Sequence, residues 1–369
     1  MTFHDDLALL LRPAGGGIPL VSTGLAEQQA LQRRLYGVGT GAEVEARWRD
    51  DLARATSARA VLLGVPSDTG AGFRRGANLG PSAIRARLLE EDPAFLDRAR
   101  AAGLVELGDV VVVPQLLHDE MLSEAQLEAT RLALYPATSP ADRAVLPVSP
   151  LSIAARALAG VVAANPDARV LVLGGDHSTA WPAVKALAGA RPGLGIVQVD
   201  AHTDLLPERL GIRYCFGTWS YHANELLGRG GRLLQVGTRA SRHERAHWES
   251  TLGVRQLWAE DVRRDPAAAL DEIVSHLRRA GVESVYLTND IDGTDSAQAD
   301  ATGTPEPGGL EPAFVAALIR RVGRELGLAG GDVMEVAPGL GGPAATARTL
   351  AVAVRYLKET IAAVVGIEV

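Results

Sequence analysis

From about residue 58 onward, short and continuously apolar runs alternate with Ala-, Leu- and Arg-rich stretches that are long enough to be helices. An apolar run without polar alternation is typical of a strand that is buried on both faces. Helices between such strands supply the crossover connections of a parallel sheet and cover its two faces. The pattern therefore predicts a three-layer α/β/α fold with a mostly parallel sheet.

Six apolar runs are predicted to be strands: Ala60–Val65, Arg169–Leu173, Gly195–Val199, Leu233–Gly237, Val282–Leu287 and Asp332–Val336. Four longer patterns predict helices: Ser152–Ala164, Pro266–Ala280, Pro312–Leu326 and Ala344–Val364. Ligands of such sheets bind beyond the carboxyl ends of the strands. The polar residues that follow each apolar run are therefore the candidate functional residues.

Two segments lie outside this alternation. Residues 1–57 form an N-terminal extension with a helical pattern at Leu25–Leu35, and residues 114–148 form a Pro-containing insertion in the main domain, 58–369. A peripheral helix and a surface loop are the simplest interpretations of these segments. An arm for oligomer assembly or an active-site lid is the alternative.

The composition excludes several classes of protein. Hydrophobic residues make up 47% of the 369 residues, which is enough for a large buried core. No apolar stretch reaches the roughly 18 residues that a membrane-spanning helix needs. The formal net charge of -7 and the lack of a Lys/Arg run argue against nucleic-acid binding. We therefore expect a small-molecule ligand, with no nucleic-acid partner and no membrane.

Two features of the sequence predict a cytoplasmic protein. The single cysteine, Cys215, has no partner for an internal disulfide. Asp5 and Asp6 stand where a signal peptide would carry basic residues.

Potential metal ligands follow two of the predicted strands. The sequence GGDHS at 174–178 places His177 after two glycines that permit a sharp turn, although a single His at this point is more typical of a core or helix-capping residue. The sequence DAHTD places Asp200, His202 and Asp204 directly after the next strand. These three side chains share one face if the extended geometry continues.

A third strand repeats the arrangement, because Asp290 and Asp292 follow the run at Val282–Leu287. Four carboxylates at the ends of neighbouring buried strands would repel one another and raise one another's pKa unless cations lay among them. Two divalent cations balance four negative charges. Separate solvation of each pair on loops is the alternative, and it leaves the three clusters unexplained. Carboxylate and imidazole ligands without thiolate favour manganese, with nickel, cobalt or iron as alternatives, over structural zinc.

These motifs resemble the signature blocks of the arginase/agmatinase (ureohydrolase) family, which also includes formimidoylglutamase. The blocks are GGDHS at 174–178, DAHTD at 200–204 and the segment 288–309, which begins TNDID and ends GTPEPGG. Segments 64–85 and 334–338 also agree with the family pattern. The resemblance extends from about residue 58 to the end of the chain.

The resemblance implies an arginase-like fold and a binuclear manganese centre that hydrolyses a C–N bond of a linear amidine or guanidine. By the family pattern, one ion would be held by His177, Asp200, Asp204 and Asp290, and the other by Asp200, His202, Asp290 and Asp292. Asp200 and Asp290 would bridge the two ions. The resemblance also implies a homotrimer or a homohexamer.

Glu335 matches the acidic residue with which the family faces the cationic group of its substrates, and a carboxylate suits a planar cation with several N–H donors. The chain departs from the family at Phe216, where arginases and agmatinases commonly have a His that is their proposed proton shuttle. Formimidoylglutamases also tend to lack this His. His222 is a candidate replacement for the shuttle, and a packing or surface role is the alternative.

The loop 205–221 is rich in apolar and aromatic side chains, and its only cations are Arg209 and Arg213. An Arg in this loop could pair with a substrate carboxylate, and the rings could pack on an alkyl chain or a cationic group. Alternatively, these side chains belong to the core and the rim. The candidate substrate contacts are Arg213, Phe216, Trp219, Asn289 and Glu335, of which Asn289 replaces a hydrophobic residue of the family pattern.

These observations predict a metal-dependent hydrolase of a linear amidine or guanidino compound, with Glu335 and His222 as its catalytic side chains. The first hypothesis is an agmatinase or guanidino-acid hydrolase that releases urea and an amine. A formimidoylglutamase, which releases formamide and glutamate, is nearly as well supported, and an arginase comes third. Phe216 suggests a hypothesis of another class, a catalytically weak metal-binding subunit with a regulatory or assembly role.

Overall fold

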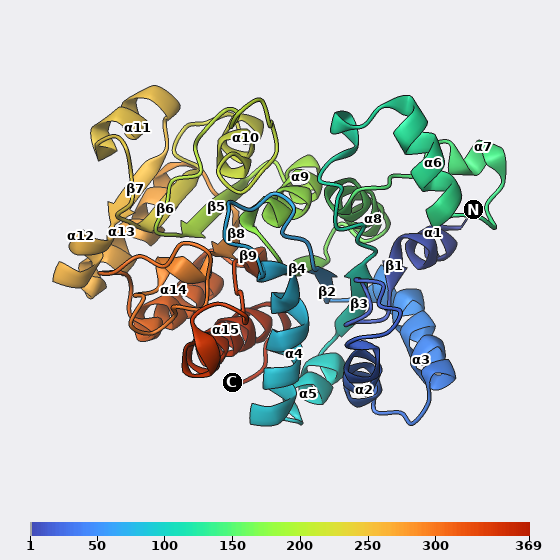
Figure 1. The fold of residues 1–369 in the computed structure, drawn as a ribbon. Helices are drawn as coiled ribbons and strands as arrows, with labels where there is room; N and C mark the ends of the chain where they lie inside the picture. Colours follow the sequence, from blue (N-terminus) through green and yellow to red (C-terminus); the bar gives the residue numbers. More distant parts are fainter. Residues whose placement is uncertain (1) are drawn as a thin grey trace.

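A nine-stranded sheet runs through residues 2–369, the part of the chain that the computed structural model describes (Figure 1). Its strands are β1 Leu11–Arg12, β2 Ala60–Val65, β3 Leu104–Val110, β4 Arg169–Gly174, β5 Leu194–Val199, β6 Leu233–Thr238, β7 Arg255–Trp258, β8 Ser284–Asn289 and β9 Leu328–Val333. They lie in the order β1-β3-β2-β4-β9-β8-β5-β6-β7. Within this described range the pairing is parallel, except that β1 is antiparallel to β3. The predicted three-layer fold with a mostly parallel sheet is confirmed.

The helices form two layers around this sheet. They are α1 Phe3–Leu10, α2 Leu25–Tyr36, α3 Gly41–Arg54, α4 Gly80–Glu91, α5 Phe95–Ala101, α6 Glu124–Leu134, α7 Pro140–Arg143, α8 Pro150–Ala164, α9 Trp181–Ala190, α10 Trp219–Leu226, α11 Arg245–Leu252, α12 Ala259–Arg264, α13 Pro266–Arg279, α14 Pro312–Glu325 and α15 Gly342–Val365. Helices α8, α9 and α10 pack together on one face of the sheet, and α4, α15 and α14 pack together on the other (Figure 1). Helix α14 turns an apolar stripe inward that includes Phe314, Leu318 and Val322. The four predicted helices are confirmed as α8, α13, α14 and α15.

The strand predicted at Asp332–Val336 runs instead over Leu328–Val333. This strand was misplaced because Gly330 and Gly331 interrupt its apolar run. The strand β9 lies between β4 and β8 at the centre of the sheet, and a Cβ atom at Gly330 would collide with the backbone of Val170. Close approach of a neighbouring strand therefore requires glycine where the prediction looked for a bulky apolar residue.

The strands β1, β3 and β7 were also missed, and β3 shows why. Its Glu106 and Asp109 interrupt the apolar pattern, yet both side chains are buried around Arg85 of α4. The guanidinium of Arg85 lies 2.9 Å from Glu106 Oε1 and 2.6 Å from Asp109 Oδ1. Asp109 Oδ2 accepts a hydrogen bond from Gly15 N at 2.8 Å. A buried cation thus makes acidic residues compatible with a buried strand.

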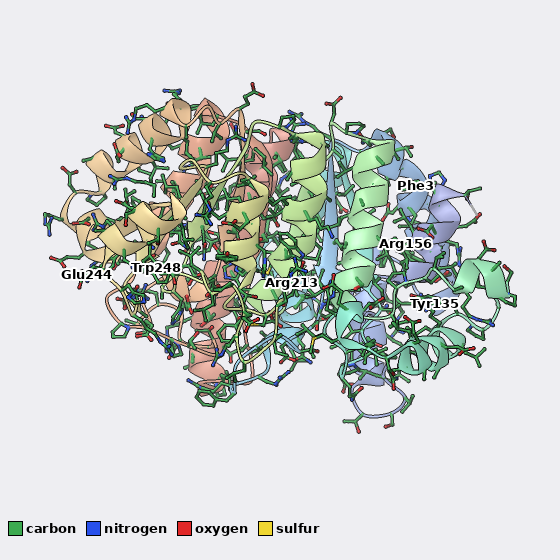
Figure 2. The ribbon with its side chains drawn as sticks, turned by 90° about the horizontal axis from the view of Figure 1, so that it is seen from above. Phe3, Tyr135, Arg156, Arg213, Glu244 and Trp248 are labelled. Atoms are coloured by element: carbon green, nitrogen blue, oxygen red, sulfur yellow. The ribbon has the colours of Figure 1, made fainter. Side chains whose placement is uncertain are left out.

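The N-terminal segment completes one edge of the sheet. The strand β1 pairs with β3, and Trp48 of α3 donates a hydrogen bond from Nε1 to Leu107 O at 2.8 Å. An ion pair of 2.7 Å between Arg156 of α8 and Asp6 of α1 fixes the first helix (Figure 2). The helix predicted at Leu25–Leu35 is present as α2. The segment is part of the core, so a merely peripheral helix does not describe it.

The insertion at 114–148 contains α6, α7 and the short turn Asp119–Met121. The ring of His118 packs on the ring of Tyr214 with centroids 4.8 Å apart, and Glu120 lies 3.8 Å from the guanidinium of Arg213. The insertion therefore contacts the loop 205–221.

The carboxyl ends of β4, β9, β8 and β5 lie next to one another in the sheet. Because every one of these strands runs in the same direction, the turns that follow them meet at one edge. That edge holds the predicted ligands. Within residues 2–369, no helix combines the length and apolar character needed to cross a membrane.

Candidate metal centre

Four adjacent strands end in turns that carry acidic or imidazole side chains. His177 follows β4, Asp200, His202 and Asp204 follow β5, Asp290 and Asp292 follow β8, and Glu335 follows β9. Glycine makes the first of these turns possible, because a Cβ atom at Gly175 would collide with the backbone of Ser67. The structure brings all six predicted ligands together.

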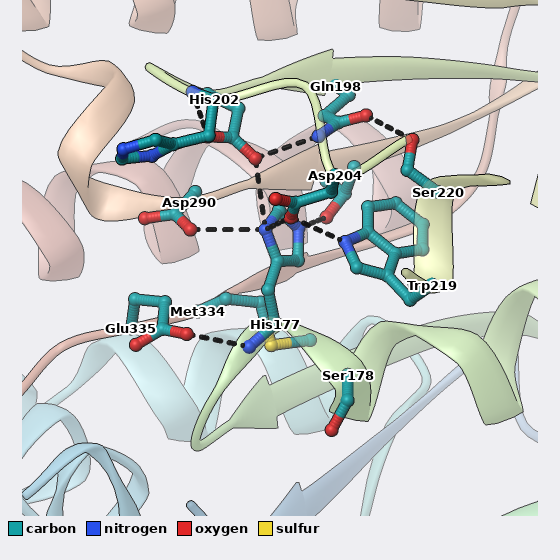
Figure 3. A network of polar contacts seen from close by, with 12 residues as sticks. His177, Ser178, Gln198, His202, Asp204, Trp219, Ser220, Asp290, Met334 and Glu335 are labelled. Carbon is teal, nitrogen blue, oxygen red and sulfur yellow. Dashed lines mark hydrogen bonds and ion pairs between the residues drawn. The ribbon is translucent and has the colours of Figure 1, made fainter. Parts of the chain in front are cut away.

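The first cluster surrounds Nδ1 of His177 (Figure 3). This nitrogen lies 3.2 Å from Asp200 Oδ2, 3.4 Å from Asp204 Oδ2 and 3.1 Å from Asp290 Oδ2. All four residues are buried. Three carboxylates and one imidazole nitrogen thus converge on one point.

The second cluster shares Asp200 with the first. His202 Nδ1 lies 3.1 Å from Asp292 Oδ2 and 3.6 Å from Asp200 Oδ1. The two oxygens of Asp200 therefore face different clusters, which is the arrangement of a bridging ligand. His202 is partly exposed, so the second cluster lies nearer to solvent than the first.

The residues after β5 do not reach this geometry by continuing the strand, as the sequence suggested. The backbone turns after Val199, and Asp204 has a φ of 52°, in the left-handed region. His202 N donates a hydrogen bond of 2.7 Å to Asp200 Oδ1, which closes the turn. The three ligands share a side because of this turn, so the expectation of alternating extended side chains was wrong.

The hydrogen bonds of His177 test whether a cation fits the first cluster. Its Nε2 lies 2.8 Å from Thr288 Oγ1, and this hydroxyl donates its only proton to Asp332 Oδ1 at 2.8 Å. Nε2 of the imidazole must then be the donor to Thr288. In the neutral ring, Nδ1 carries a lone pair, and among residues 2–369 it has no hydrogen-bond partner of good geometry. A buried lone pair that faces three carboxylates fits a metal ion.

The pKa shifts of the metal-free cluster show the same need for positive charge. Burial, reinforced by the charges of Asp292 and Asp200, raises the pKa of Asp290 well above its usual value. Burial also lowers the pKa of His202, but Asp292 and Asp200 outweigh this effect and raise it to about 12. Protons therefore occupy the cluster when metal ions do not.

Three residues that orient the candidate ligands through hydrogen bonds were not predicted from the sequence. Gln198 Nε2 donates to Asp200 Oδ2 at 2.7 Å, and Thr288 and Asp332 orient His177 as described above. The signal that could have found Gln198 and Thr288 is a polar side chain inside an otherwise apolar strand. Burial raises the pKa of Asp332 to about 6.

Trp219 was expected to contact substrate, but the structure buries it completely behind the ligands. Its Nε1 donates to Asp204 Oδ2 at 3.1 Å, and its ring centroid lies 4.6 Å from that of His177 (Figure 3). Asn289 is also fully buried, and its Nδ2 donates to Asp332 O at 3.1 Å. Both residues therefore support the centre from behind and do not line the cleft.

Glu335 lies beside the first cluster. Its Oε1 accepts a hydrogen bond from His177 N at 3.0 Å, and its φ of 61° is in the left-handed region, which is uncommon outside glycine (Figure 3). Burial, with the charges of Asp290 and Asp176, raises the pKa of Glu335 well above its usual value. A strained, buried carboxylate at this place is typical of a functional residue.

A cleft of about 570 Å³ opens onto the ligands His202 and Asp204. Phe216, a predicted substrate contact, lies in its wall. Arg213 does not line it: its side chain is 62% exposed, and its guanidinium lies 3.8 Å from Glu120 (Figure 2).

His222 is likewise absent from the lining of this cleft. Its Nε2 lies 3.0 Å from Arg213 O, and its ring packs near the rings of Tyr214 and Trp181. Burial lowers the pKa of His222. The structure thus places His222 in an aromatic cluster beside the loop, where it packs, and does not bring it to the ligands.

Comparison with known proteins agrees with this geometry. A model of the arginase family matches residues 58–360 of the chain. Proclavaminate amidinohydrolase of Streptomyces clavuligerus is 31% identical over 288 residues, which cover 75% of this chain and 80% of that protein. Guanidinobutyrase of Pseudomonas aeruginosa is 30% identical over 287 residues, which cover 76% of this chain and 79% of that protein.

The solved structure of proclavaminate amidinohydrolase from Streptomyces clavuligerus has the same fold. It aligns with a TM-score of 0.63 at 29% identity and covers 83% of this chain and 91% of that one. The sequence motifs, the convergence of the ligands and these comparisons agree. The chain belongs to the arginase family and, like its relatives, is a metal-dependent hydrolase of C–N bonds outside peptides.

Proposed function

We propose that the chain hydrolyses a linear guanidino compound and releases urea and an amine. The observation that carries this proposal is the lone pair of His177 Nδ1 among three carboxylates, with the buried carboxylate of Glu335 beside it. The names of the relatives, guanidinobutyrase and proclavaminate amidinohydrolase, support a guanidino or amidino substrate.

Two divalent ions would be held by the two ligand sets of the family pattern: His177, Asp200, Asp204 and Asp290 for one, and Asp200, His202, Asp290 and Asp292 for the other. We propose manganese, with nickel, cobalt or iron as alternatives, because oxygen and imidazole donors suit these ions. When bound, such ions supply an activated water at neutral pH and stabilise charge that develops on the substrate.

Glu335 is the side chain that we assign to the guanidinium of the substrate. No cationic side chain of residues 2–369 forms an ion pair with it, and it is 7% exposed. A buried carboxylate of this kind gains hydrogen bonds and a counter-charge when a planar guanidinium binds. Its carboxylate would hold the guanidinium beside the ligands and fix the orientation of the scissile C–N bond.

Proton transfer to the leaving amine differs in this chain from the family pattern. Phe216 has no proton to give, and His222 lies outside the cleft. We therefore propose that water in the cleft supplies the proton. Phe216 also favours a second candidate within the family, a formimidoylglutamase that releases formamide and glutamate.

The proposal is tested with a substrate panel. Protein loaded with manganese or nickel is incubated with arginine, agmatine, guanidinobutyrate, guanidine and formiminoglutamate, and urea, formamide and ammonia are detected separately. Urea from a guanidino compound supports the proposal, and formamide supports the alternative. Two bound ions without turnover on the whole panel would favour a regulatory or assembly subunit.

Metal analysis tests the ligand assignment independently of turnover. Asp200→Asn removes a charge that faces both clusters and should lower occupancy of both sites. His202→Ala should chiefly empty the second site. Equal loss from both variants, or one ion in the unsubstituted protein, would contradict the assignment.

The assembly, location and domain boundaries are further parts of the proposal. We propose a cytoplasmic homotrimer or homohexamer whose catalytic domain spans 58–369, to which the extension 1–57 contributes an edge strand. Light scattering of the full chain tests the assembly, and a stable monomer at micromolar concentration would contradict it.

A further inference from the structure

Two arginines of the cleft have no acidic partner among residues 2–369. Arg209 and Arg242 both line the cleft that opens onto His202 and Asp204. Neither guanidinium forms an ion pair or a hydrogen bond with another residue in the described part of the chain, 2–369. Glu208 is the one acidic side chain in the cleft wall besides the ligand Asp204. The outer wall therefore has an excess of positive charge.

Arg209 is held in place by the side chain that departs from the family pattern. Its Cζ atom lies over the ring of Phe216, 4.8 Å from the ring centroid. Phe216 is itself anchored, because its N donates a hydrogen bond to Gly70 O at 3.1 Å. A guanidinium stacked on an aromatic face keeps its N–H edge free for a ligand.

The backbone of the loop also fixes Arg209. Its N donates to Ile212 O at 2.9 Å, and Ile212 N donates to Arg209 O at 2.9 Å. Leu210 between them has a φ of 52°, which is compatible with a tight reversal of the chain. The stacked ring and the reversal together limit the orientations of Arg209, so that less entropy is lost when a ligand binds.

The cleft joins groups of opposite charge. It opens onto Asp204 of the first cluster, and Glu335 lies beside that cluster, so the cationic end of a substrate is attracted there. Arg209 and Arg242 in the cleft lining attract an anionic end. We propose, on the basis of the proposed function, that Arg209 stacked on Phe216 binds a carboxylate at the far end of the substrate. The chain would thus select guanidino acids over guanidino compounds with an ammonium or an uncharged tail.

Three substrates of similar length but different tail charge test this proposal. They are guanidinobutyrate with a carboxylate, butylguanidine with no tail charge and agmatine with an ammonium group. Arg209→Gln should lower kcat/KM for guanidinobutyrate by about 10-fold, because it removes a charge-assisted hydrogen bond, and should leave butylguanidine unchanged. The same variant should raise kcat/KM for agmatine, since it removes a like charge.

Two further variants separate the effect of the Phe216 ring from the effect of the Arg209 charge. Phe216→Leu keeps Arg209 but removes the ring, so guanidinobutyrate should lose about 2- to 5-fold in kcat/KM. Arg87→Gln on α4 removes an exposed positive charge on a helix that carries none of the cleft residues and serves as the control for net charge. Equal effects of Arg209→Gln and Arg87→Gln on guanidinobutyrate would overturn the proposal.

A binding measurement distinguishes failure of this proposal from failure of the proposed function. Calorimetric titration with guanidinobutyrate does not need turnover, and Arg209→Gln should weaken its binding by about 10-fold relative to butylguanidine. If no guanidino compound yields urea but this difference in binding persists, the proposed function is wrong and the carboxylate site stands. If urea is formed but the three compounds bind equally well to the unsubstituted protein and to Arg209→Gln, the proposed carboxylate site is wrong.

Discussion

Trp219 donates a hydrogen bond from Nε1 to Asp204 Oδ2 at 3.1 Å while its ring packs on His177, 4.6 Å between centroids. Two side chains of the first ligand cluster therefore rest on one fully buried indole. The indole begins α10, directly after the loop whose side chains line the cleft. The loop 205–221 thus both lines the cleft and carries Trp219, which contacts the candidate ligands Asp204 and His177.

We predict that Trp219→Phe weakens metal binding at the first site by about 10-fold, because partners of metal ligands typically contribute that much to affinity. Competition with a fluorescent chelator measures the effect. Trp48→Phe is the matched control, since this buried indole donates a hydrogen bond from Nε1 to Leu107 O of β3 at 2.8 Å, away from the two clusters. Unchanged metal affinity in Trp219→Phe would show that the hydrogen bond to Asp204 is dispensable.

Thr288→Val should weaken metal binding by about 10- to 100-fold, because it breaks the chain of hydrogen bonds from His177 to Asp332. Thr288→Ser keeps the hydroxyl and should restore affinity. Thr360→Val is the control, since this buried hydroxyl bonds a carbonyl of its own helix. If Thr288→Val and Thr288→Ser behave alike in chelator competition, the hydroxyl does not set the tautomer of His177.

His222→Asn should lower stability and leave kcat per metal-loaded chain nearly unchanged. The ring packs near Tyr214 and Trp181, so its loss should cost about 1 kcal/mol in the free energy of unfolding. Denaturant titration and steady-state kinetics measure the two quantities. A fall in kcat of about 100-fold at full metal content would instead identify His222 as the proton shuttle.

Metal affinity should rise with pH. Burial lowers the pKa of His202, but Asp292 and Asp200 raise it from 6.5 to about 12 in the metal-free fold. Between these values the folded protein holds a proton that the unfolded chain lacks, so the metal-free protein loses stability as pH rises through this window. A metal ion must displace the proton, so its affinity should increase by about tenfold per pH unit for each proton released.

Calorimetry in buffers of different ionisation enthalpy measures this proton release. We expect at least one proton per chain on loading near neutral pH. An affinity that is independent of pH between about 7 and 9 would contradict the pKa shift of His202.

Arg85→Met should destabilise the fold by about 3–5 kcal/mol, because it leaves Glu106 and Asp109 buried without a cation. Denaturant titration measures the loss. Arg87→Met on the exposed side of the same helix is the control, and it should cost less than about 0.5 kcal/mol. Similar stability of the two variants would mean that the buried carboxylates are protonated at little cost.

The sequence predicted which acidic and imidazole side chains cluster, because their positions follow from local rules. A buried strand is recognisable from its apolar run, and the residue after it lies at the carboxyl edge of a parallel sheet. His177, Asp200 and Asp290 were found in this way. The strand β9 was misplaced because glycine replaces apolar residues where strands approach closely, as at Gly330.

The surroundings of the ligands could not be predicted in the same way. Trp219 and Phe216 belong to one aromatic loop, yet Trp219 is buried behind the ligands and Phe216 faces the cleft. Which side each ring takes depends on where the loop packs against Gly70 and His177, which are distant in sequence. No local pattern contains that information.

The sequence by itself thus determined the fold class, the candidate metal ligands and the family of this protein, since these depend on periodicity and on residue types at strand ends. Only the tertiary structure decided that Thr288 and Asp332, 44 positions apart, orient His177, and that Arg209 stacks on Phe216 over the cleft. Such contacts join segments whose separation along the chain carries no periodic signal. They are fixed when the sheet and its turns come together, because burial then leaves each polar group only one set of partners.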